Sequence, residues 1–132
     1  MKLWSRLYIT VWLAFFSCVL LPRWMGAYVG HSAHVLLGLL MVFLTIGNAR
    51  QLAALPVPAR LKRISKVTAG FAIFQIVCGA ALGAFMHWFP DTRYVASVLY
   101  GAHIVSALAV LAQASSVATA YDMWEEKEFE EA

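Results

Sequence analysis

Four histidines lie in or beside the long apolar runs of this sequence, at positions 31, 34, 87 and 103. An ionisable side chain inside a membrane-length apolar run is costly, so it usually faces a bundle interior, a cavity or a ligand. Neutral imidazole is also a good ligand for haem iron and for other transition metals. The pattern therefore favours metal or haem chemistry, with a hydrogen bond between neighbouring helices as the alternative for any single histidine.

The composition indicates a membrane protein. Of the 132 residues, 62% are hydrophobic and 13% are charged, which departs strongly from the usage of soluble domains. Because one span needs roughly 20 apolar residues, the chain has room for about four spans. The formal charge of +3 is therefore taken to reflect the orientation of the chain in the membrane. The expected partner is the lipid bilayer and not a nucleic acid.

Four apolar runs predict an all-α integral membrane protein, a bundle of four transmembrane helices. The spans are expected at about residues 7–27, 28–49, 67–86 and 94–121, within one domain of residues 1–121. A signal peptide in place of the first span is disfavoured, because no small-x-small cleavage site follows it. Residues 122–132 form an acidic tail, expected to be a solvated helix end or a frayed terminus, with a docking role as the alternative.

Basic residues are concentrated between the second and third spans. This loop carries Arg50, Arg60, Lys62, Arg63 and Lys66, whereas the other two loops carry only Arg23 and Arg93. By the positive-inside rule both termini are cytoplasmic, and we expect the plasma membrane of a prokaryote. Cysteines 18 and 78 fall within spans, where an apolar setting keeps a thiol inert, so no disulfide is expected.

This topology places all four histidines in the outer half of the membrane. At a rise of about 1.5 Å per residue, His34 and His103 lie roughly 9 Å and 13 Å from the outer ends of their spans, depths that cannot be distinguished. Two histidines at matched depth on different helices predict a haem iron held from both sides. Gly38, Gly79 and Gly83 would open room for the macrocycle, with close helix contact as the alternative for Gly79 and Gly83.

Further polar residues lie near the outer rim. Arg23 and Arg93 are expected to pair with haem propionates, or to act only as interfacial anchors. His31 and His87 are candidates for proton exchange, because imidazole titrates near neutral pH. As alternatives, His31 is a hydrogen-bond partner of a ligand and His87 is an exposed interfacial residue.

The third span contains "FQIVCGAALGA", the second has a histidine near its outer end, and the fourth has one in its outer half. This layout resembles one four-helix half of the haem A synthase family. The resemblance implies His34 and His103 as axial iron ligands and Gln75 as the polar group of the family's Q-x-x-x-G pattern. Where the family has a glutamate three residues before the second-helix histidine, this chain has His31, and the family's outer-loop cysteine pair is absent.

These observations favour a membrane haem-binding protein that uses a bis-histidine haem b for electron transfer, with a membrane quinol as electron donor. The resemblance implies oxidoreductase chemistry of the haem A synthase type. The first alternative to an electron carrier is a half-size haem A synthase that is active as a homodimer. The second is a copper or other metal site formed by all four histidines. The third is a cofactor-free accessory subunit of a larger respiratory complex.

Overall fold

The computed structural model describes residues 2–19, 27–89, 91 and 93–130, and the side chains within these ranges except those of residues 19, 27–31 and 128–130. The described residues form four helices and no strand, so the prediction of an all-helical protein is confirmed. The helices are α1 (Leu3–Val19), α3 (Ala27–Ala54), α4 (Ala59–Trp88) and α5 (Arg93–Glu130). Three of them, α3, α4 and α5, are long and apolar enough to cross a membrane, while α1 is a shorter apolar helix of 17 residues.

Two prolines set the turn between α3 and α4. The helix α3 ends just before Leu55, which precedes Pro56 and is therefore disfavoured in the helical conformation. Pro58 directly precedes α4 with φ −52° and ψ 140°. Lys62 Nζ donates to the carbonyl oxygen of Ala53 at 3.1 Å, which satisfies one of the last carbonyls of α3. The chain reverses direction over residues 55–58.

The helices α3, α4 and α5 extend beyond the predicted spans at both ends, whereas α1 begins before the predicted first span and ends at Val19, and residues 20–26 of that span lie outside the described residues. The predicted fourth span ends at about residue 121, but α5 continues to Glu130, so the described part of the acidic tail is a helical extension. At its start, Asp122 accepts hydrogen bonds from two aromatic side chains of α1. Trp4 Nε1 donates to Oδ1 at 2.8 Å, and the hydroxyl of Tyr8 donates to Oδ2 at 3.2 Å. Hydropathy predicts the part of a helix that lies in lipid and does not predict where the helix ends.

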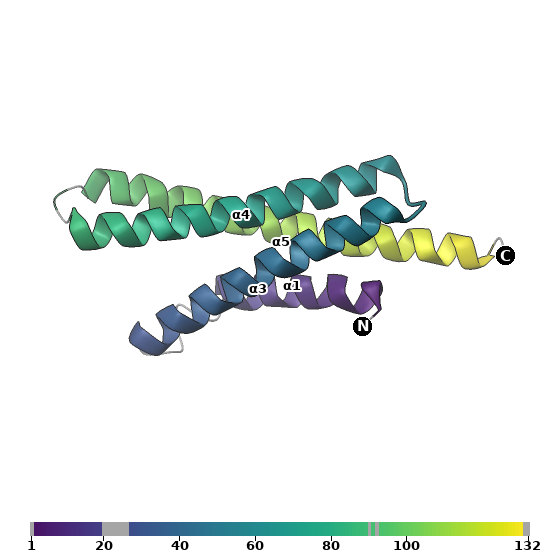
Figure 1. The fold of residues 1–132 in the computed structure, drawn as a ribbon, viewed down its shortest axis with the longest axis horizontal. Coiled ribbons are helices and arrows are strands. Elements are labelled where there is room, and N and C mark those ends of the chain that lie inside the picture. The colour runs from purple at the N-terminus through teal and green to yellow at the C-terminus, as the bar shows by residue number, and fades with distance from the viewer. Residues whose placement is uncertain (1, 20–26, 90, 92, 131–132) are drawn as a thin grey trace.

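The four helices form an antiparallel ring in the order α1, α3, α4, α5, and α5 closes the ring against α1. The helices α3 and α5 are therefore diagonally opposite and run in the same direction (Figure 1). The chain termini and the α3–α4 turn lie toward one end of the molecule, which we call the closed end. Toward its N-terminus, α3 diverges from the α4–α5 pair (Figure 1). We call the end where α4 finishes and α5 starts the splayed end.

Interior residues recur three and four apart along each helix, and together they stack into layers. The closed-end cluster is apolar and contains Leu3, Leu7, Leu52, Val57, Leu61, Val117, Ala118 and Tyr121. A second apolar layer, the middle apolar layer, contains Ala14, Met41, Ala72 and Val110. Beyond it toward the splayed end, Cys78 and Ser106 are the only buried side chains among those described. The core therefore lies in the closed half, and the splayed half is loosely packed.

Candidate functional site

His34 of α3 and His103 of α5 meet across the diagonal of the bundle, on the splayed side of the middle apolar layer. Their ring centres are 5.9 Å apart, and the ring planes are inclined by 58°. His34 lies seven residues before Met41, and His103 lies seven residues before Val110, where both helices contribute to that layer. Because α3 and α5 run in the same direction, equal spacing brings the two histidines to one level.

Gln75 of α4 and Ser106 of α5 complete this level, which we call the histidine layer. The amide nitrogen Nε2 of Gln75 lies 3.2 Å from Nε2 of His103. The hydroxyl of Ser106 lies within hydrogen-bond distance of two acceptors, Oε1 of Gln75 and, at 3.0 Å, the carbonyl oxygen of His103. Since Ser106 donates to the amide oxygen, the amide nitrogen faces the imidazole and donates to it. The proton of a neutral His103 ring then lies on Nδ1.

The Nδ1 atom of His103 is buried and has no hydrogen-bond partner among the described residues. A buried N–H group without a partner costs about 1–3 kcal/mol. Structural histidines in membrane bundles normally avoid this cost by bonding a neighbouring helix. The imidazole of His103 is thus held by Gln75 at one nitrogen and is unsatisfied at the other, which marks it as the least satisfied polar group of this layer among the described residues.

The glycines near this layer fall into two groups. A Cβ atom at Gly79 would lie 3.1 Å from Cε1 of His103, and one at Gly38 would lie 3.0 Å from Cδ1 of Ile76. At Gly83 and Gly101 a Cβ atom would meet no neighbour within 4 Å. Gly38 and Gly79 therefore lie at close contacts, and Gly79 makes room for the His103 ring itself, whereas Gly83 does not lie at the close helix contact that was its alternative interpretation.

Replacing Gly83 with alanine is expected to stabilise the bundle by about 0.5–1 kcal/mol, because alanine lowers the entropic cost of forming a helix. The matched change Gly79→Ala is expected to gain less or to destabilise, since the His103 ring must shift by a few tenths of an ångström. Unfolding in sodium dodecyl sulfate, followed by circular dichroism, compares the two variants. Equal stabilisation by both changes would show that His103 does not pack on Gly79.

The other predicted site residues are not brought to the histidine layer. His87 is exposed and lies eight residues beyond Gly79, about 12 Å further along α4. Arg93 is exposed at the start of α5, about 15 Å of helix rise from His103. The backbone of residue 31 belongs to α3, but the side chain of His31 lies outside those described, and Arg23 lies outside the described residues altogether.

The described side chains contain no group of three or more histidine, cysteine, aspartate or glutamate residues that could hold a metal ion. The two histidines in the layer fit a cofactor that supplies the remaining ligands itself. Two imidazoles from facing helices are a donor set that haem iron accepts, so the chemistry of these side chains is compatible with a haem.

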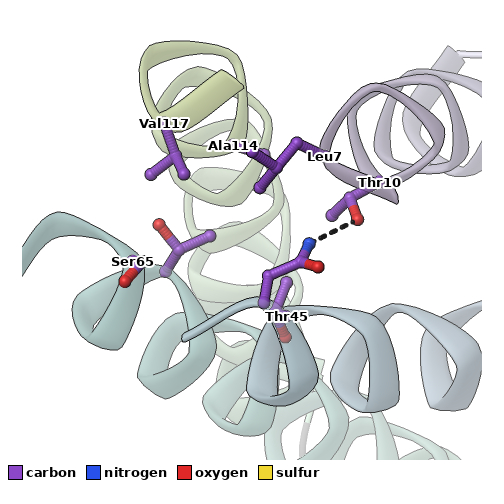
Figure 2. Close-up of a pocket in the computed structure, with 8 residues that line it drawn as sticks. Leu7, Thr10, Thr45, Ser65, Ala114 and Val117 are labelled. Atoms are coloured by element: carbon purple, nitrogen blue, oxygen red, sulfur yellow. Dashed lines mark hydrogen bonds between the residues drawn. The ribbon is translucent and has the colours of Figure 1, made fainter. Parts of the chain in front are cut away.

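A second polar layer lies between the closed-end cluster and the middle apolar layer. Its side chains surround a cavity of about 10 Å³, a volume that a single water molecule fills. We call this cavity and the polar side chains that line it the polar chamber. These side chains belong to Thr10, Thr45, Asn48, Ser65 and Thr68 (Figure 2). This chamber lies in the best-packed part of the bundle, and sequence analysis did not anticipate it.

Arg6 of α1 is linked to this chamber. Its Nε and Nη2 atoms donate to Oδ1 of Asn48 at 3.1 and 2.9 Å. Asn48 in turn donates from Nδ2 to the hydroxyl of Thr10 at 3.0 Å (Figure 2). A Cβ atom at Gly47 would lie 3.4 Å from Nη2 of Arg6, so this glycine leaves space for the guanidinium group. The network joins α1 to α3. The sequence shows the small polar residues of this network one by one, but it does not show which residues of the other helices they bond.

No protein-family model, curated protein or solved structure matches this chain. The resemblance to the haem A synthase family therefore stays a prediction that depends on the residues quoted for it above.

Proposed function

We propose that this bundle binds one haem b between His34 and His103 and serves as an electron carrier in the membrane. The observation that supports the proposal is the ring pair itself, two imidazoles from diagonally opposite helices with centres 5.9 Å apart. A haem held by these two imidazoles would supply one-electron transfer. A cofactor-free accessory subunit has no comparable use for this pair.

In this proposal the protein residues hold and orient the ligands. His103 is fixed by Gln75, which is itself held by the hydroxyl of Ser106. Without a cofactor, the Gln75 amide holds the ring by the Nε2 lone pair of His103, which is the lone pair that an iron ligand needs. Gln75 therefore positions His103 in the cofactor-free protein, and iron binding at Nε2 would displace this hydrogen bond.

We further propose that all four helices cross the plasma membrane of a prokaryote, with both termini in the cytoplasm. The basic residues between positions 50 and 66 support this orientation by the positive-inside rule. With 17 residues α1 is about 26 Å long, close to the roughly 30 Å of the hydrocarbon core. Electrons would then enter from a membrane quinol at the splayed end, where His87 is exposed.

The test is a reduced-minus-oxidised visible spectrum of the full chain, produced with haem supplied and purified in mild detergent. We expect a sharp b-type α band and no change on adding carbon monoxide, because both axial positions are filled. Circular dichroism of the same sample establishes that the protein is helical. Colourless helical protein would overturn the proposal, and a carbon monoxide complex would rule out the bis-histidine arrangement.

A further inference from the structure

A groove runs between α3 and α4 on the outside of the bundle, at the closed end. It has a volume of about 210 Å³ and is lined by Ile46, Ala49, Arg50, Ala53, Lys66 and Ala69. The four α3 residues are spaced three and four apart, so they share one face of that helix. Three alanines, two from α3 and one from α4, make the floor apolar and shallow. Arg50 and Lys66 are exposed, one on each helix.

The cations of this groove have no acidic residue near them in the sequence. The first acidic residue of the chain is Asp91, and the other six follow position 121. Exposed Arg60 and Arg63 add cations at the same end of the bundle. The acidic residues of α5 that also lie at this end form no ion pair with Arg50 or Lys66 among the described residues. An occupant must therefore carry negative charge for the two cations and an apolar part for the alanine floor.

We propose that this groove binds an anionic phospholipid, with an acyl chain on the alanine floor and the phosphate between Arg50 and Lys66. Basic pockets between transmembrane helices are suited to anionic headgroups, and each lysine or arginine near the surface contributes to the attraction. Both lining helices are long and apolar enough to cross a membrane, so the groove faces acyl chains directly. The proposal is independent of haem binding, because the groove shares no residue with the histidine layer.

Spin-labelled lipids in phosphatidylcholine vesicles test this assignment. We expect the full-length protein to immobilise labelled phosphatidylglycerol in preference to labelled phosphatidylcholine in electron paramagnetic resonance spectra. Arg50→Gln and Lys66→Gln are each expected to lower that preference about five-fold. The matched control is Arg60→Gln, which removes one exposed cation from the same end of the bundle without lining the groove. It is expected to keep the wild-type preference.

A second variant separates the groove from general surface charge. Ala53 is exposed, so Ala53→Phe fills the groove without disturbing the core, and it is expected to displace the lipid while all cations remain. An equal loss in Arg60→Gln, or full retention in Ala53→Phe, would mean that the attraction is diffuse and would overturn the proposal. Native mass spectrometry that finds two chains and no retained lipid would assign the groove to a second copy instead.

Discussion

The variant His103→Ala is expected to purify without haem, and His34→Ala is expected to behave in the same way. Each change removes one of two axial ligands, and the remaining imidazole has no replacement among the side chains described in the layer. Residues that only orient a metal ligand contribute about 10–100-fold to affinity, so loss of a ligand itself should exceed that range. Haem titration of the apoprotein, followed by absorbance, measures the effect.

Two control variants test whether the loss of haem is specific to the two proposed ligands. His87→Ala removes an exposed histidine far along α4 and is expected to retain the wild-type spectrum. Gln75→Leu removes the hydrogen bond that occupies the Nε2 lone pair of His103 in the cofactor-free protein, so it is expected to keep the six-coordinate spectrum and not to weaken haem binding. Free imidazole should restore a low-spin spectrum in His103→Ala, because the small alanine leaves space for it. A wild-type spectrum in either ligand variant would contradict the assignment.

Leu52→Ala is expected to cause the largest loss of stability in the bundle. Leu52 has 0% of its surface exposed and lies in the closed-end cluster, where three other helices surround it. Removing buried leucine atoms and leaving a cavity costs about 2–5 kcal/mol. Because the splayed half has few buried side chains to compensate, we expect the whole bundle to unfold at lower concentrations of sodium dodecyl sulfate.

The matched control is Leu36→Ala on the same helix. Leu36 has 67% of its surface exposed, so its truncation leaves no cavity and is expected to change stability little. Circular dichroism and tryptophan fluorescence should report the same transition in both variants. If the two changes were equally harmful, the closed-end cluster would not be the main source of stability.

Much of this arrangement could be predicted from the sequence, because apolar length and helical spacing are local properties. The spacing of His34 and His103 in their spans predicted that the two residues lie at one level, and the structure brings their rings together. The helix ends were less predictable. The helix α5 continues past its apolar segment, where Trp4 and Tyr8 of α1 bind Asp122, and these partners are more than 100 positions apart in the sequence.

The polar chamber shows why the rest could not be predicted. Thr10, Thr45 and Asn48 each look like isolated polar residues in apolar helices. Their hydrogen bonds depend on how α1 and α3 are rotated about their axes, and no local pattern specifies that rotation. The same holds for Gly79, whose contact with the His103 ring depends on the packing of α4 against α5.

The middle apolar layer has a consequence for energy conversion. Ala14, Met41, Ala72 and Val110 separate the polar chamber from the histidine layer, and none of these four side chains can relay a proton. The described side chains of this layer therefore offer no relay between the closed end and the histidines. If the bundle carries electrons as proposed, and if electrons and protons enter and leave together at the splayed end, no net charge moves across the bilayer. Turnover of the carrier would then be electroneutral and insensitive to the membrane potential.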